Sequence, residues 1–303
     1  MRYQHRPLYA IAFGQTDLGL IRHNNEDSLL AVDLTSGLVA PTPSTLNHVI
    51  GEKGSLFLVA DGMGGAEAGE VASQMAVELV SQQVSERLSR ARFLNRVAFV
   101  QILKDSVQQA NLAIHQESRN NTAQRGMGTT LTAAAVYDSA VFFAQVGDSR
   151  GYLMRNSIIA QMTQDQSLVA RLVASGELSA EQAKDHPRRN VILQALGPQE
   201  EVDVAISFAD LKREDRVVLC SDGLSGKIDN EELKEMLARF PEPKDACQQL
   251  VETARERGGE DNITVIVIKF EGEGLPLSLP DEVPACQPFN DKPRRYFWPW
   301  GRS

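Results

Sequence analysis

The sequence predicts an α+β domain in which antiparallel strands and pairs of helices form separate layers. Nine runs have strand character, and several of them are rich in β-branched or aromatic residues and separated by only a few turn residues. Two long stretches with helical periodicity interrupt these strands, and two shorter helical stretches precede the last one. This grouping argues against a doubly wound parallel sheet.

The predicted strands follow one another in chain order. They lie at residues 8–16, 28–33, 55–61, 129–138, 140–148, 150–155, 202–208, 216–222 and 262–270. The segment "VYDSAV" between two of them indicates a tight hairpin. Residues 36–54 separate the second strand from the third, and we interpret them as a surface loop.

The two long helices are predicted from apolar residues that recur mostly at four-residue steps. Residues 67–90 carry Val71, Met75, Leu79, Val84 and Leu88, and residues 93–116 carry Leu94, Val97, Leu103, Val107, Ala110 and Ile114. The two shorter helices are expected near residues 230–239 and 244–257.

Composition and charge exclude several classes of protein. The 303 residues are 42% hydrophobic and 23% charged, as expected for a globular protein with ample material for a core. A net charge of −9 without a basic patch in the body of the chain argues against a nucleic-acid partner. No apolar run approaches the roughly 18 residues of a transmembrane segment, and the N-terminus has no signal-peptide core. Three scattered cysteines make no disulfide framework, so we expect a cytoplasmic protein. We also expect a monomer.

A change of composition near residue 271 divides the chain. Residues 271–303 hold six of the thirteen prolines and both tryptophans, which disfavours helix and central strand. We therefore predict a domain over residues 1–270 and a flexible, extended tail over 271–303. Alternatively, the aromatic segment "RRYFWPW" docks on a partner, on the domain or on a membrane surface.

Four aspartates share one arrangement, each at an end of an apolar strand and next to glycine or a small polar residue. Asp61 lies in "LFLVADG", Asp148 in "FFAQVGDS" and Asp222 in "VVLCSDG". Asp261 just precedes the last strand in "GGEDNITVIVIKF". One such aspartate is usually a turn or cap residue, but four with the same pattern indicate a common site.

If these carboxylates converge, their mutual repulsion must be relieved. Two like charges about 4 Å apart repel by roughly 1 kcal/mol in water and by about 4 kcal/mol at an effective dielectric constant of 20. Either some aspartates are protonated or hard cations lie between them. Oxygen ligands without His or Cys favour Mg²⁺ or Mn²⁺, and the neighbouring glycines leave room for ions and their water.

An anion site is indicated by Arg22, which lies five residues before Asp27 in "TDLGLIRHNNEDSLL". Such an arginine is usually a solvated surface residue. Beside a metal pair held by carboxylates, however, its guanidinium group would match the oxygens of a phosphate.

Six segments together resemble the bacterial type 2C metal-dependent Ser/Thr protein phosphatases, the PPM family. They are, in the family's order, "RHNNED", "VADGMGGAEAGEVAS", "GMGTTL", "VGDSRGYL", "SDGLSG" and "GGEDNITVIVI". The resemblance covers roughly residues 10–270. It implies a four-layer α-β-β-α sandwich of two antiparallel sheets flanked by helix pairs, in agreement with the predicted layers.

The resemblance also implies ligands for two Mn²⁺ or Mg²⁺ ions and for a weaker third ion. Asp61 corresponds to the bridging carboxylate, and the carbonyl of Gly62 to a ligand of the first ion. Asp222 and Asp261 match ligands of the second ion. Asp148 matches a ligand of the third, to which Asp222 would also contribute.

Other residues match the parts of the family's site that bind phosphate and order water. Arg22 matches the phosphate-binding arginine, and Glu26 and Asp27 match an acidic pair that orders waters near the metals. Residues 165–195 match a flap beside the site. Its charged sequence suits contact with a phosphoprotein and includes Arg171, Arg188 and Arg189.

The expected activity is hydrolysis of phosphoserine or phosphothreonine in proteins by a metal-activated water, reversing a Ser/Thr kinase. Arg22, Asp61 and Asp222 are the expected catalytic residues. Two alternatives are a pseudophosphatase that binds phosphoproteins without useful turnover and a metal phosphoesterase acting on small molecules.

One departure from the family concerns the general acid. Many relatives have a histidine at the position of Ala66 or Met63. His23 or His186 could substitute, or a metal-bound water could protonate the leaving group. Cys220 lies inside an apolar strand without a nearby base, so we expect it to be structural.

Overall fold

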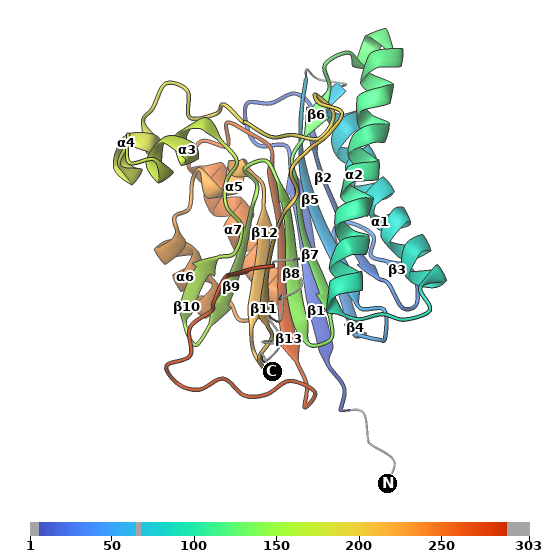
Figure 1. The fold of residues 1–303 in the computed structure, drawn as a ribbon. Coiled ribbons are helices and arrows are strands. Elements are labelled where there is room, and N and C mark those ends of the chain that lie inside the picture. The colour runs from blue at the N-terminus through green and yellow to red at the C-terminus, as the bar shows by residue number, and fades with distance from the viewer. Residues whose placement is uncertain (1–5, 65–67, 290–303) are drawn as a thin grey trace, which may run out of the picture.

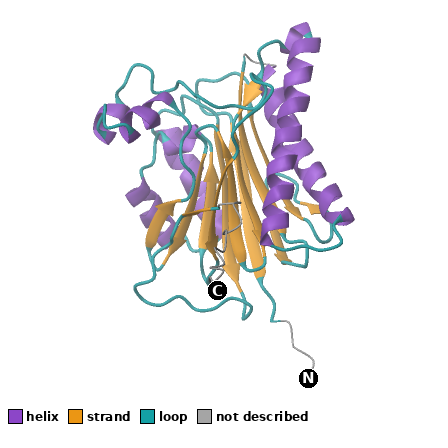
Figure 2. Cartoon of the chain, viewed as in Figure 1, coloured by secondary structure: helices purple, strands orange, loops and turns teal. Residues whose placement is uncertain are grey.

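The computed structural model describes residues 6–64 and 68–289, and it confirms the predicted α+β class. Two antiparallel sheets pack face to face, with a pair of long helices outside one sheet and a second helix pair outside the other (Figures 1 and 2). The four layers are therefore helix, sheet, sheet and helix, as the resemblance implied.

The first sheet has six strands, all in antiparallel pairs. In spatial order they are β10 (Ile158–Gln161), β9 (Arg150–Arg155), β12 (Arg216–Cys220), β13 (Ile263–Glu271), β1 (Tyr9–Asp17) and β4 (Ser44–Val49).

The second sheet has eight strands. In spatial order they are β14 (Gln287–Pro288), β11 (Ala205–Asp210), β8 (Ala140–Val146), β7 (Leu131–Tyr137), β5 (Ser55–Met63), β2 (Asp27–Asp33) and β3 (Leu38–Val39), while β6 (Gly128–Thr129) pairs with the end of β5.

The helices fall into three groups. The long pair is α1 (Ala68–Arg90) and α2 (Arg96–Asn120), which a short 3₁₀ turn follows (Thr122–Gln124). The second pair is α6 (Asn230–Arg239) and α7 (Pro243–Glu256), preceded by the single turn of α5 (Asp222–Ser225). Two short helices project beside the sheets, α3 (Leu168–Ala174) and α4 (Ala180–Lys184). No helix in the described ranges is both long and apolar enough to span a bilayer.

Three apolar clusters fill the spaces between the four layers. Strand β5 contributes side chains to two of these clusters. Leu56 and Leu58 face α1 and α2, while Phe57 and Val59 face the other sheet. Strand β13 does the same, with Ile266 toward the partner sheet and Val265 and Val267 toward α7. Strands buried on both faces read as continuous apolar runs, which is why the sequence revealed them.

The prediction of a surface loop over residues 36–54 was wrong. This segment contains β3 and β4, and β4 pairs with β1 at the edge of the six-stranded sheet. Of the residues in β4, only Leu46 is buried. An edge strand that buries so little lacks a clear alternation of apolar and polar residues.

Helix boundaries also shifted from the predicted ones. α2 begins at Arg96, because the side chain of Asn95 caps it by accepting a hydrogen bond from the Ala98 N–H. It continues to Asn120, beyond the predicted end at residue 116. The start predicted for the first long helix, residue 67, lies outside the described residues.

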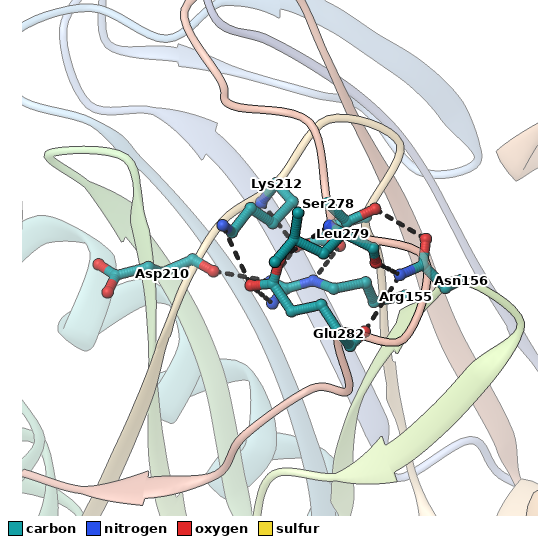
Figure 3. A network of polar contacts seen from close by, with 8 residues as sticks. Arg155, Asn156, Asp210, Lys212, Ser278, Leu279 and Glu282 are labelled. Atoms are coloured by element: carbon teal, nitrogen blue, oxygen red, sulfur yellow. Dashed lines mark hydrogen bonds and ion pairs between the residues drawn. The ribbon is translucent and has the colours of Figure 1, made fainter.

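The first part of the expected flexible tail packs on the domain. Residues 271–289 run along the surface, pair through β14 with β11, and place Phe289 against Phe142 and Phe208. Two residues that are distant from the tail in sequence hold it in place (Figure 3). Arg155 donates a hydrogen bond to Glu282, and Asn156 donates to the carbonyls of Leu279 and Glu282. The remaining residues, 290–303, which include "RRYFWPW", lie outside the described part of the chain.

A buried ion pair lies beneath this segment. The Arg155 guanidinium donates to both oxygens of Asp215, at 2.9 and 2.6 Å, and their side chains are only 5% and 0% exposed. Lys212 donates a backbone N–H to the same carboxylate. Arg155 thus neutralises a carboxylate that has no access to water and also connects it to Glu282.

We expect Arg155→Met to lower the free energy of unfolding by about 3–5 kcal/mol, because it leaves the Asp215 carboxylate buried without its cation. Urea denaturation measures this change. Arg90→Met is the matched control, since Arg90 forms an exposed pair with Glu86, and it should change stability by less than about 1 kcal/mol. Equal effects of the two substitutions would contradict the role given to the buried pair.

Candidate metal centre

The predicted acidic residues converge where strands from both sheets end. Asp61 is near the end of β5, Asp148 lies between β8 and β9, Asp222 begins α5 just after β12, and Asp261 precedes β13. All three of the others act electrostatically on Asp61, as does Asp27. The structure therefore gathers residues separated by up to 200 positions into one site.

Hydrogen bonds to both the N–H and the carbonyl of Asp61 hold its backbone in place. Its N–H donates to the Thr130 hydroxyl at 3.0 Å, and its carbonyl accepts from the Thr130 N–H at 2.8 Å and from the Thr129 hydroxyl at 2.9 Å. Desolvation raises the pKa of Asp61 well above its usual value, and the neighbouring carboxylates of Asp27 and Asp222 raise it further.

Asp222 and Asp61 lie close enough for their carboxyl groups to interact directly. Desolvation is the main reason that the pKa of Asp222 is raised, and repulsion from Asp261 is the next. Without a cation, these acids relieve their repulsion by binding protons.

Asp148 has an oxygen without a hydrogen-bond partner among the residues that the structure describes. This oxygen, Oδ1, is buried. Desolvation raises the pKa of Asp148 to about 7, with further contributions from Asp222 and Asp165. A buried carboxylate oxygen without a partner is costly, and it is the kind of atom that a cation would bind.

Asp27 lies opposite Asp61 in the pairing of β2 with β5. It is buried, and desolvation raises its pKa to about 7. Its carboxylate accepts a hydrogen bond of 2.7 Å from the Ser221 hydroxyl, which in turn accepts from the Thr264 N–H. Because Ser221 and Thr264 belong to the other sheet, this chain of hydrogen bonds joins the two sheets beneath the site.

Arg22 reaches the acidic cluster from the loop before β2. Its guanidinium donates to Asp261 at 2.8 Å, and the two side chains are 48% and 37% exposed. Glu26, four residues later, also lies within electrostatic reach of Arg22 and Asp261. Desolvation raises the pKa of Glu26, and Arg22 opposes that shift.

Two glycines allow the close approach of backbone segments beside Asp61. A Cβ on Gly62 would collide with the carbonyl oxygen of Gly69 and lie 2.6 Å from that of Glu26. A Cβ on Gly69 would lie 2.7 Å from the Glu26 carboxylate. Bare backbone at both positions is therefore required for the Glu26 and Asp61 segments to lie together.

The sequence analysis did not identify Asn262, which organises the loop that carries Arg22. Its side chain accepts from the Glu26 N–H at 2.8 Å and donates to the carbonyls of Leu18 and Asn24. The only signal in the sequence was its place directly after Asp261, where an Asn in a turn is unremarkable.

Gln166 and Asp165 were also missed as individual residues, although they begin the predicted flap. Gln166 accepts from the Gly147 N–H at 2.9 Å, and Asp165 forms an ion pair of 2.7 Å with Arg150. These contacts fix the first residues of the flap to the turn that carries Asp148. Beyond them the flap contains α3 and α4.

The histidine missing from the family's motif has a proposed substitute in the flap. His186 lies in the flap, where its ring accepts from the Arg188 N–H. Ala66 lies outside the described residues, so the structure says nothing of its surroundings. Cys220 is fully buried, and desolvation raises the pKa of its thiol to about 12, which fits a structural residue.

The cluster fits hard divalent cations by the chemistry of its donors. Within the described residues, it offers carboxylate oxygens and no sulfur or imidazole ligand, the acids repel one another, and the Asp148 oxygen has no partner. In the described ranges, no group of three or more His, Cys, Asp or Glu side chains is placed closely enough to hold a metal ion as the structure stands. Asp61 and Asp222 instead contact each other, and Asp261 contacts Arg22.

Comparison with known proteins identifies the family. The family model described as protein phosphatase 2C matches residues 44–262, more than half of the chain. This chain belongs to the protein phosphatase 2C family. The serine/threonine phosphatase Stp of Listeria innocua is 38% identical over 255 residues, which are 84% of this chain and 94% of that protein. The predicted enzyme class, a serine/threonine protein phosphatase, is confirmed.

Solved structures of bacterial phosphatases have the same fold. The crystal structure of the Mycobacterium tuberculosis serine/threonine phosphatase PstP superposes with a TM-score of 0.72 at 33% identity, covering 87% of this chain and 99% of that one. A structure of the PstP catalytic domain in complex with two manganese ions gives a TM-score of 0.70 at 31% identity, with coverages of 87% and 99%.

We expect Asp222→Asn to stabilise the metal-free phosphatase by about 1–4 kcal/mol, because it removes one of several mutually repelling charges. The same change should reduce the rise in melting temperature on adding Mn²⁺. Thermal unfolding in EDTA and in Mn²⁺ measures both effects. Asp185→Asn, at an exposed position in the flap, serves as the control. A metal-free protein destabilised by Asp222→Asn would argue against carboxylate repulsion.

Proposed function

We propose that this phosphatase hydrolyses phosphoserine and phosphothreonine in proteins with two Mn²⁺ or Mg²⁺ ions in the acidic cluster. Asp61, the Gly62 carbonyl, Asp222 and Asp261 would hold the two ions. Asp148 and Asp222 would hold a weaker third. The observation that carries this proposal is the gathering of mutually repelling carboxylates at one place, with a buried Asp148 oxygen that has no partner in the described part of the chain.

The chemistry of bound ions suits this reaction, since two adjacent divalent ions supply a water of lowered pKa and charge that offsets the developing charge of the transition state. A related PstP catalytic domain binds two manganese ions. The role of this chain is to hold the acids rigidly, through the hydrogen bonds that Thr129 and Thr130 make to the backbone of Asp61.

Arg22 is the proposed binder of the substrate's phosphoryl group. It is half exposed, its guanidinium reaches the acidic cluster, and its planar fork can donate two parallel hydrogen bonds to phosphoryl oxygens. This contact orients the phosphorus for in-line attack. Glu26 and Asp27 lie beside the cluster and are proposed to order its waters.

The proton for the leaving alkoxide is proposed to come from water in the site. No residue of the acidic cluster is a histidine, and His186 belongs to the flap, where it contacts the Arg188 backbone. The physiological reaction is proposed to reverse a cognate Ser/Thr kinase, with Arg171, Arg188 and Arg189 of the flap contacting the phosphoprotein. The cytoplasmic location and the monomeric state stay predictions of the sequence.

We expect EDTA to abolish hydrolysis of a phosphothreonine peptide and of p-nitrophenyl phosphate, and added Mn²⁺ to restore it. Asp222→Asn should reduce kcat by about a thousandfold in Mn²⁺, on the scale of losing one charge that stabilises the transition state. Steady-state kinetics measure both effects, with Asp185→Asn as a control that keeps wild-type rates. Turnover that resists chelation would exclude the proposed metal chemistry.

Arg22→Ala should lower kcat/KM by about a hundredfold, since a charge-assisted bidentate contact with the phosphoryl group is lost. Arg22→Lys should recover only part of this loss because a lysine cannot make the paired contact. The two variants are compared by steady-state kinetics and by inhibition with inorganic phosphate. Equal activity of Arg22→Ala and the wild type would remove Arg22 from the phosphate site.

A further inference from the structure

Two large apolar side chains stand exposed directly before Arg22. Leu20 is 56% exposed and Ile21 is 63% exposed, and Leu18 nearby is 40% exposed. Single exposed apolar residues are ordinary on a protein surface. An adjacent group of them, next to a candidate phosphate-binding arginine, is a candidate contact surface.

The backbone beneath these side chains is fixed rather than loose. Gly19 has a φ of +78°, and a Cβ there would collide with the carbonyl oxygen of Asp261 and lie 2.6 Å from that of Gly259. The Gly19 N–H donates to Asp17 Oδ1 at 2.9 Å, and the Leu20 N–H donates to the Gly259 carbonyl at 2.7 Å.

The carbonyl of Leu18 is also held, by the side chain of Asn262. The loop is thus tied to the same segment that carries Asp261. Its apolar side chains are presented at a fixed place relative to the acidic cluster, which lowers the entropy lost when they bind something.

The residue before Asp261 is charged and exposed. Glu260 forms an ion pair with Lys227, and Arg189 of the flap lies within electrostatic reach of Glu260. The surroundings of Arg22 and Asp261 therefore include both apolar and charged side chains.

We propose that Leu20 and Ile21 bind an apolar side chain that flanks the phosphorylated residue of a protein substrate. The inference rests on the proposed function of Arg22 as the phosphate-binding residue. Leu20 and Arg22 are two residues apart, so their Cα atoms are separated by at most about 7 Å. That reach matches a substrate residue one or two positions from the phosphorylated one in an extended peptide.

The test compares phosphothreonine peptides that differ only in the flanking residues. One set carries Leu within two positions on the N-terminal side, a second carries Leu on the C-terminal side, and a third carries Gly at all these positions. For the wild type in Mn²⁺, we expect kcat/KM for one Leu set to exceed that for the Gly set about tenfold, mainly through KM.

The double substitution Leu20→Ser with Ile21→Ser should reduce that ratio to about one. Ile21→Val, which keeps an apolar surface, should retain most of it. The control is Val97→Ser, since Val97 is a similarly exposed apolar residue on α2, and it should leave the ratio at the wild-type value.

Hydrolysis of p-nitrophenyl phosphate, which has no flanking residue, distinguishes failure of the proposed function from failure of the apolar subsite. A wild-type protein that does not hydrolyse this ester in Mn²⁺ overturns the proposed function itself. A wild-type protein that hydrolyses it but treats the three peptide sets alike overturns the apolar subsite. So does a ratio that the double substitution leaves unchanged.

A second copy of the chain is the other possible occupant of this surface. Analytical ultracentrifugation of the wild type and of the Leu20→Ser, Ile21→Ser protein distinguishes it. A wild-type dimer that the double substitution dissociates would overturn the substrate subsite. A monomer in both cases, together with the loss of peptide preference, supports it.

Discussion

The repulsion among the acids at the strand ends is the constraint on which the site depends. Asp61, Asp222, Asp148 and Asp27 all have raised pKa values, and desolvation is the largest cause for each. A fold that gathers such groups loses stability unless something compensates for their charge. Bound protons would serve this purpose in the metal-free chain, because the pKa of each of these acids is raised. The sandwich therefore has to be stable enough elsewhere to hold an arrangement that is unfavourable by itself.

That stability comes from the layers and from polar links across them. The apolar cluster between the sheets sets their spacing, and α1, α2, α6 and α7 cover the outer faces. Directly beneath the site, Ser221 connects Asp27 of the eight-stranded sheet with Thr264 of the six-stranded sheet. Since acids from both sheets take part, any sliding of one sheet against the other would pull the cluster apart. The hydrogen bonds through Ser221 and Asn262 oppose such sliding where it would matter most.

Much of this arrangement was predictable because it leaves local marks in the sequence. Strands buried on both faces are continuous apolar runs, and an aspartate beside glycine at the end of such a run stands out. The edge strand β4 has no such mark, since it buries only Leu46. Asn262, Ser221 and Gln166 escaped notice because their importance lies in hydrogen bonds to residues distant in sequence. The packing of residues 271–289 was hidden for the same reason, as its partners Arg155 and Phe142 lie more than 100 residues away.

Two arginine–aspartate ion pairs differ in burial, and this difference gives them different roles. Arg155 and Asp215 are shielded from water, so separating them would expose an uncompensated charge to an apolar interior. Arg22 and Asp261 are about half and a third exposed, and a pair of that kind contributes little to stability because water and salt screen it. Exchanging Asp261 for a phosphoryl group therefore costs Arg22 little. In the proposed function, the exposed pair would release its partner when a substrate arrives, as a phosphate-binding arginine beside a metal ligand requires.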